Sequence, residues 1–77
     1  MAFTIKVIDD NGRGIEGLRV MLRFVEPMRG DPPTEDTDEE GRAKFEGFDE
    51  GEVQVFIDGV DCGVHNYEDG EIVTITR

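Results

Sequence analysis

The sequence predicts a single all-β domain of about seven short antiparallel strands, and three observations support this fold class. Apolar and polar side chains alternate in several separate stretches, which is the period of a half-buried strand. Glycine, aspartate and asparagine recur between these stretches, where turns are expected. No stretch has the apolar spacing of an amphipathic helix. The 77 residues leave room for one domain only, spanning 1–77.

The strands are expected at residues 3–8, 18–25, 42–45, 52–58 and 71–76, with a weaker strand at 62–67 and a short one that begins the 37–45 hairpin. In each of the clear strands, every second side chain is apolar and should point into the core. These core positions are Phe3, Ile5, Val7, Leu18, Val20, Leu22, Phe24, Phe45, Val53, Val55, Ile57, Val73 and Ile75.

Two turns carry hairpin signals. In residues 37–45, Asp38 can cap its own turn through its side chain, and Gly41 can adopt the positive φ that closes a short hairpin. Asp69-Gly70 is a two-residue hairpin signal between the last two strands. Residues 26–33 contain all three prolines and are expected to form a loop or an edge crossing.

Charge excludes several classes of partner. Asp and Glu number 19 against 8 Lys and Arg, so the formal net charge is −11. A potential of this sign repels phosphate backbones and anionic lipid, which makes nucleic acid and membranes poor partners. The single cysteine cannot form an internal disulfide, and the N-terminus lacks the features of a signal peptide. We therefore expect a cytoplasmic protein if Met1 is the native start.

The turn and core positions resemble a known family. The pattern Val7-x-Asp9, Gly12, Ile15-x-Gly17-Leu18-x-Val20, Thr37-Asp38-x-x-Gly41-x-Ala43-x-Phe45 and Phe48-x-x-Gly51-x-Val53-x-Val55 is similar to the carboxypeptidase-regulatory-like domain and its transthyretin-like and Cna-B-type relatives. The resemblance covers roughly residues 4–58. It implies a Greek-key β-sandwich of the transthyretin (prealbumin) type in which the strands at 18–25 and 52–58 are neighbours. It also implies an accessory module rather than an enzyme.

Two relatives have chemistry that this sequence lacks. The transthyretin-type hydrolases use a first-strand histidine and a Tyr-Arg-Gly-Ser C-terminus, whereas this chain has Thr4-Ile5-Lys6-Val7 and ends in Thr74-Ile75-Thr76-Arg77. Cna-B-type repeats join a first-strand lysine to a last-strand asparagine. Lys6 is suitably placed, but the last strand contains no asparagine. A small hydrolase is thus the least favoured of the functions considered.

Other catalytic arrangements also find little support. Serine is absent, so a Ser-His-Asp triad cannot form. Cys62 and His65 are the only thiol and imidazole, and at a spacing of three along a strand they should point to opposite faces unless Gly63 interrupts the strand. We therefore expect no enzymatic activity and no cofactor.

Acidic turns suggest a cation site as an alternative. If successive strands alternate in direction, the turns at 9–10, 38–40 and 58–61 meet at one end of the domain, where carboxylates could hold Ca²⁺. The candidate ligands are Asp9, Asp10, Asp38, Glu40, Asp58 and Asp61. The opposite end is nearly as acidic, and Asp and Asn also favour turns for backbone reasons. A cation- or carbohydrate-binding module that uses these loop ends is the alternative function.

An outward apolar set suggests a protein interface. Met21, Val25 and Phe56 alternate out of phase with the core, and Arg23 lies among them. Apolar groups bordered by arginine are typical of a protein interface, although cover from the loop at 26–36 would explain them equally well. Met28 and Arg29 in that loop are further candidates for contact. The favoured function is a non-catalytic interaction or accessory module with a protein partner or a homo-oligomeric state.

Overall fold

The computed structural model describes residues 2–24, 33–46 and 51–77, and within them it contains strands and no helix. The seven strands are β1 (Ala2–Ile8), β2 (Arg19–Phe24), β3 (Thr34–Asp36), β4 (Arg42–Glu46), β5 (Gly51–Ile57), β6 (Val60–Tyr67) and β7 (Ile72–Thr76). The all-β fold class is confirmed. In the described part of the chain, no helix is long and apolar enough to cross a membrane.

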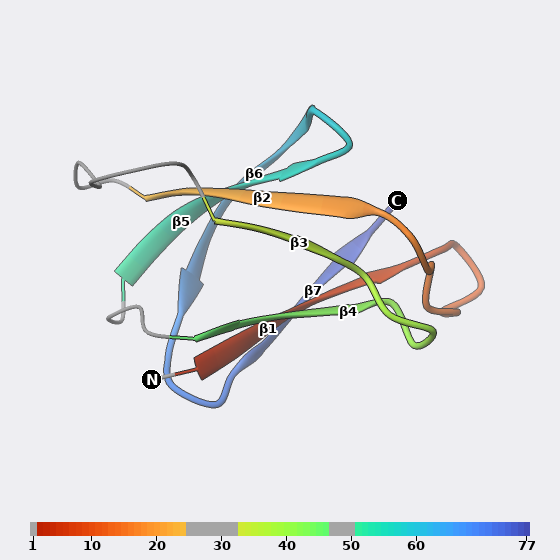
Figure 1. The fold of residues 1–77 in the computed structure, drawn as a ribbon, viewed down its shortest axis with the longest axis horizontal. Coiled ribbons are helices and arrows are strands. Elements are labelled where there is room, and N and C mark those ends of the chain that lie inside the picture. Colours follow the sequence, from red (N-terminus) through yellow and green to blue (C-terminus); the bar gives the residue numbers. More distant parts are fainter. Residues whose placement is uncertain (1, 25–32, 47–50) are drawn as a thin grey trace.

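The strands form two sheets that pack face to face (Figure 1). A three-stranded sheet has the order β4-β1-β7, and a four-stranded sheet has the order β3-β2-β5-β6. Pairing is antiparallel in both sheets with one exception, because β1 and β7 run parallel. The prediction of antiparallel strands throughout was therefore wrong at this pair. A parallel pair needs a long crossover, and here the rest of the chain supplies it.

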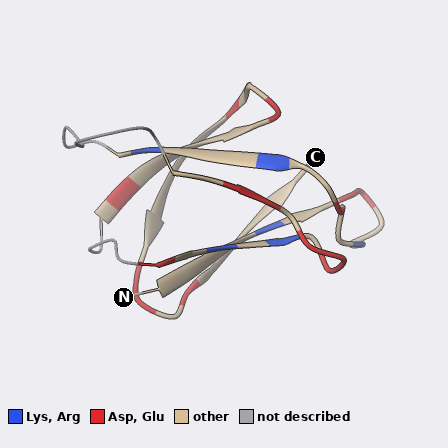
Figure 2. Cartoon of the chain, viewed as in Figure 1, with Lys and Arg blue, Asp and Glu red and all other residues tan. Residues whose placement is uncertain are grey.

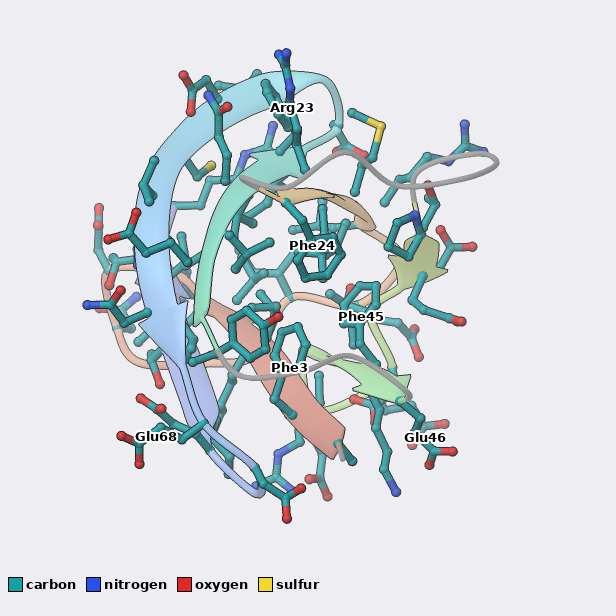
Figure 3. All side chains as sticks on the ribbon, turned by 90° about the vertical axis from the view of Figure 1, so that its left-hand side faces the viewer. Phe3, Arg23, Phe24, Phe45, Glu46 and Glu68 are labelled. Carbon is teal, nitrogen blue, oxygen red and sulfur yellow. The ribbon has the colours of Figure 1, made fainter. Side chains whose placement is uncertain are left out.

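The core lies between the sheets and follows the predicted alternation. Its buried members are Phe3, Ile5, Val7, Val20, Leu22, Ala43, Phe45, Val53, Val55, Ile57, Tyr67, Val73 and Ile75. Leu18 and Phe24, also predicted as core, are partly buried against this cluster. Figure 3 shows Phe3, Phe24 and Phe45 between the sheets. Every predicted core position thus contacts the interior.

Tyr67 completes the aromatic end of the core, and alternation did not predict it. Its ring stacks on Phe3 at a centroid distance of 4.3 Å, and Phe24 meets it edge-on at 5.9 Å. Phe3 also stacks on Phe45 at 5.6 Å. Tyr67 ends β6 opposite Gly51 of β5, where it bridges the two sheets. Only the tertiary structure shows that this side chain faces inward.

The turn at 38–41 forms as expected, but the strands that it joins do not form a hairpin. The backbone N–H of Asp38 donates to the carbonyl of Arg42 at 2.9 Å, and Gly41 has the predicted positive φ of 79°. Beyond that pair the chain diverges, because β3 belongs to the four-stranded sheet and β4 to the three-stranded sheet. The predicted hairpin is therefore a crossing between sheets. Residues 34–36, expected in the loop, form the edge strand β3.

Asp69-Gly70 also joins the two sheets, since it links β6 to β7. The one hairpin with a two-residue turn in the described residues connects β5 and β6 through Asp58-Gly59. Asp58 has φ 50° and Gly59 has φ 83°, and positive φ at both positions matches the twist of paired strands. The Asp-Gly dipeptide favours tight turns in general. It therefore forms a hairpin turn at 58–59 and a connection between the two sheets at 69–70.

Candidate protein interface

The outer face of the four-stranded sheet carries the predicted apolar pair. Met21 on β2 and Phe56 on β5 are directly opposed in the strand register, and both are half-buried. They lie on the central two strands of that sheet, and their side chains point away from Val20, Leu22, Val55 and Ile57 in the core. The core therefore does not account for these two side chains.

Val64 on β6 extends this apolar surface. It is opposite Gln54 of β5 in the register and is 59% exposed. Gln54 is opposite Arg23 on its other side, and its side-chain amide donates to Asp61 at 3.0 Å. We call Met21, Phe56 and Val64, together with Arg23 and Gln54, the outer patch. The sequence did not indicate Val64, because a β-bulge shifts the alternation of β6 before this residue.

Two arginines lie on the outer face of β2, namely Arg23 within the outer patch and Arg19 beside it. Arg19 and Arg23 are exposed and lie on either side of Met21 along the strand. The ion pairs recorded within the described residues join Arg42 to Glu40, Lys44 to Glu46 and Arg77 to Asp58, so neither of these two guanidinium groups takes part in one there. Figure 3 shows Arg23 pointing away from the core. Figure 2 shows both as basic segments of β2 in a chain that is otherwise rich in acidic turns.

The remaining partner-binding candidates have different outcomes. Val25, Met28 and Arg29 lie outside the described residues. Met21, Arg23 and Phe56 share the outer face, as predicted.

A separate groove of about 420 Å³ lies between the edges of β3 and β4, and Glu35, Lys44 and Phe45 are among its lining residues. Its mixed lining and its position at the opposite margin of the sheet separate it from the outer patch.

The acidic turns at 9–13 and 38–42 pack against each other at one end of the molecule, whereas the β5–β6 turn at 58–61 lies apart from them at the top of the view (Figure 2). Most of their carboxylates accept hydrogen bonds from backbone N–H groups. Asp9 Oδ1 accepts from the N–H groups of Asn11 (2.8 Å) and Arg13 (3.0 Å). Asp38 Oδ1 accepts from Glu40 (2.8 Å) and Arg42 (3.0 Å) in the same way. These two hydrogen bonds lower the pKa of Asp38.

The other predicted cation ligands are also placed by local contacts. Asp58 accepts from the backbone N–H of Arg19 at 3.0 Å and from the guanidinium of Arg77 at 3.1 Å, which together lower its pKa. Asp61 accepts from the N–H of Gly63 at 2.8 Å, Glu40 pairs with Arg42 at 3.2 Å, and Asp10 is exposed. Across residues 2–24, 33–46 and 51–77, no three acidic, His or Cys side chains are grouped as a metal site. The structure thus brings two of the three turns together, leaves the 58–61 turn apart from them, and does not group their carboxylates within the described residues.

Cys62 and His65 lie on the same side of β6. The register shift opposite residues 54–56, with Gly63 at φ 90°, interrupts the alternation, so both half-buried side chains face inward. This is the exception that the sequence allowed for at Gly63. The imidazole Nε2 lies 3.0 Å from the carbonyl oxygen of Cys62, while the thiol Sγ lies 3.5 Å from the carbonyl of Val60. The two side chains therefore contact backbone carbonyls, which is a packing role.

Comparison with models of known protein families and with curated proteins finds no match for this chain. Geometry alone therefore ranks the candidate sites. Of these, the outer patch combines apolar side chains on central strands with arginines that form no ion pair within the described residues.

Proposed function

We propose that this protein is a non-catalytic interaction module that binds a protein partner through the outer patch. The observation that carries the proposal is the Met21–Phe56 pair, which faces away from the core on the two central strands. Apolar side chains bordered by arginine are enriched at protein interfaces, where charged groups other than arginine are depleted. The outer face of this sheet has such an apolar centre and can therefore bind a protein. Binding of this kind needs no catalytic group.

The charges of the outer patch indicate what kind of surface it binds. Arg19 and Arg23 are cationic groups in a chain of net charge −11. A partner with an apolar centre and carboxylates at its rim would complement both features. A basic or nucleic-acid partner would not. Three acidic side chains also lie on this face, so its cationic part is confined to β2: Glu52 precedes Gln54 by two residues on β5, Asp36 on β3 is opposite Arg19, and Asp61 on β6 is opposite Phe56.

We further propose that the two sheets form a Greek-key sandwich of the transthyretin-like type. The resemblance implied that the strands at 18–25 and 52–58 are neighbours, and the pairing of β2 with β5 supports it. The crossings between sheets at 38–41 and 69–70 are also compatible with Greek-key connections. A domain of this type would be an accessory module, which acts by binding a partner and performs no chemistry of its own.

A crosslinking experiment tests the interface. A photoreactive phenylalanine analogue is placed at position 56 in the source cells, with position 4 on the outer face of the other sheet as the matched control. Thr4 also lies on a strand that is paired on both sides and is half-buried. We expect a specific adduct from position 56 only. Equal adducts from both positions would contradict the proposal.

The purified partner is then titrated against single variants. Phe56→Asp should weaken binding by at least about tenfold, which corresponds to about 1.4 kcal/mol. Arg23→Glu should weaken binding by a similar factor through a residue that is exposed and outside the core, so that loss of folding cannot explain the result. Unchanged dissociation constants for both variants would refute the outer patch as the site.

A further inference from the structure

The two sheets expose four edge strands, and three of them carry features that oppose pairing with another chain. β3 has only three residues, follows Pro33 and contains Glu35 and Asp36. β4 alternates charged residues, namely Arg42, Lys44 and Glu46. Short length, proline and charge are the usual protections of an exposed edge. These two edges are therefore unsuited to strand addition.

The edge strand β6 is protected by irregularity. Its register against β5 shifts between Gln54 and Phe56, and Gly63 within the shifted segment has φ 90°. Asp61 adds a negative charge next to the bulge. A bulge twists an edge and interrupts the regular row of donors and acceptors that a new strand would need.

β7 has none of these features. Ile72–Thr76 contains no charge, proline or glycine, and all five of its residues are β-branched. Among the strands of the described residues, its sheet order places β1 on one side and none on the other. It is a regular, uncharged edge on a molecule whose other edges are all protected.

The hydrogen bonds of β1 identify which groups of β7 are free. Thr4 donates to the carbonyl of Glu71, and Arg77 donates to the carbonyl of Ile8, both at 2.9 Å. Since the N–H and C=O of a strand residue point the same way and alternate along the strand, the odd-numbered residues face β1. The N–H and C=O groups of Ile72, Thr74 and Thr76 consequently point out of the sheet edge.

The buried core residues of β7 are also more exposed to solvent than those of the adjacent strand. Val73 and Ile75 are 8% and 7% exposed, whereas Ile5 and Val7 on the adjacent β1 are fully buried at 0%. On the outer face, Ile72 is 50% exposed. An additional strand beside β7 would cover these apolar groups.

We propose that β7 pairs antiparallel with β7 of a second copy of this chain, about a two-fold axis at Thr74. In this register Thr74 is opposite Thr74 of the second copy, and Ile72 is opposite Thr76. The three free residues of each strand then meet as hydrogen-bonded pairs, each of which exchanges two bonds. The two three-stranded sheets become one continuous sheet. A shift of the register by two residues in either direction would leave some of these groups unpaired.

Side-chain complementarity favours a second copy over an unrelated strand. The facing pairs are Thr74 with Thr74, Ile72 with Thr76, and Val73 with Ile75, all of them β-branched, which suits cross-strand packing. At each end of the ladder, Glu71 is opposite Arg77 of the second copy. Opposite charges therefore meet at both ends of the paired strands, and no like charges face each other between those ends. This surface belongs to the other sheet and is independent of the outer patch.

Thr74→Glu is the primary test. Lys6 is the register neighbour of Thr74 on β1, so a glutamate at this position gains an attractive partner within the monomer. In the dimer the two glutamates would face each other at the axis and repel. Thr4→Glu is the matched control, because it adds the same charge on the same outer face beside Lys44 but away from the edge.

Sedimentation equilibrium over a range of protein concentrations, in about 0.15 M salt, measures association. We expect a monomer–dimer equilibrium for the wild type and for Thr4→Glu, and at least about tenfold weaker association for Thr74→Glu. Amide hydrogen exchange should show protection of Ile72, Thr74 and Thr76 that rises with protein concentration. A strict monomer, or a dimer that Thr74→Glu leaves intact, would overturn the proposal.

A charge exchange tests the register. Glu71→Arg and Arg77→Glu should each weaken the dimer, because like charges then meet at both ends of the ladder. The double variant restores opposite charges and should recover association, although it has lost the contacts of both side chains with Glu68 and Asp58. Failure of the double variant to recover would contradict this register. Phe56→Asp should not alter the dimer, so this proposal and the partner interface can fail separately.

Discussion

Gly14 and Gly41 lie in backbone contact, where two turns of the same type pack against each other. A Cβ atom on Gly41 would lie 2.7 Å from Cα of Gly14, and one on Gly14 would lie 2.8 Å from the backbone nitrogen of Gly41. Each turn has the sequence Asp-x-x-Gly-Arg, at residues 9–13 and 38–42, with the same pattern of hydrogen bonds. Val7 joins them by donating to the carbonyl of Gly41 at 2.8 Å. One end of the molecule thus depends on these two glycines.

Alanine at either glycine should destabilise the protein. Gly14→Ala introduces a steric clash with backbone that cannot rotate away, and we expect the free energy of unfolding to fall by about 1–3 kcal/mol. Gly41→Ala adds the strain of a positive φ of 79° and should cost more. Urea unfolding of both variants measures these losses.

Gly12→Ala separates strain from contact. Gly12 has the same φ of 79° but nothing within 4 Å of its Cβ position. This variant should therefore lose only the cost of left-handed backbone, about 1 kcal/mol. An equal loss in Gly12→Ala and Gly41→Ala would show that the contact between the turns contributes little.

Thr37 should make a measurable contribution through its hydroxyl group. It is buried, accepts from the N–H of Leu18 at 2.9 Å and donates to the carbonyl of Ile15 at 2.6 Å. Thr37→Val keeps the shape but leaves both backbone groups without this partner, which should lower the free energy of unfolding by about 1–3 kcal/mol. Thr37→Ser retains the hydroxyl and should remain closer to the wild type. Thermal or urea unfolding measures both variants. A valine variant more stable than the serine variant would contradict this role of the hydroxyl group.

Asp38 should make stability depend on acid pH. Its pKa is lowered by hydrogen bonds from the backbone N–H groups of Arg42 and Glu40. A carboxyl group whose pKa is lower in the folded state stabilises the fold above its ordinary pKa of about 3.9. That stabilisation is lost as the pH falls through the lowered value. The wild type should thus lose part of its stability below about pH 4 for this reason.

Asp38→Asn removes this titration while leaving an oxygen that can accept the same bonds. Its free energy of unfolding should fall less steeply than that of the wild type as the pH drops below about 4. Glu39→Gln removes the same charge from the same turn but leaves both bonds of Asp38 in place, so it is the matched control. Identical pH profiles for Asp38→Asn and the wild type would contradict the prediction.

Salt should stabilise the protein. A net charge of −11 on 77 residues produces self-repulsion in the folded state, which is more compact than the unfolded chain. Added salt screens this repulsion, so the melting temperature should rise between low and moderate ionic strength. Replacing Asp10 and Glu39, both exposed in the acidic turns, by lysine should reduce the dependence. A melting temperature that does not change with salt would show that the charges are arranged without net repulsion.

The sequence predicted Met21, Arg23 and Phe56 of the outer patch but did not indicate Val64. Met21 and Phe56 stand out because each is apolar at a position where alternation requires an outward side chain. Val64 does not stand out, because a bulge in β6 changes which residues face outward. The relation between β7 and the sheet edge was also not available, since it depends on which strand lies beside β1.

The sequence by itself determined which side chains face the core and where the chain turns. Both properties are local: alternation assigns faces, and residues such as Asp38 and Gly41 adopt turn geometry through their own side chains or φ angles. Only the tertiary structure decided which strands pair. The turns at 38–41 and 69–70 lead into different sheets, and β1 meets β7 from the far end of the chain. Strand pairing depends on hydrogen bonds and core contacts between distant residues, which no local pattern specifies.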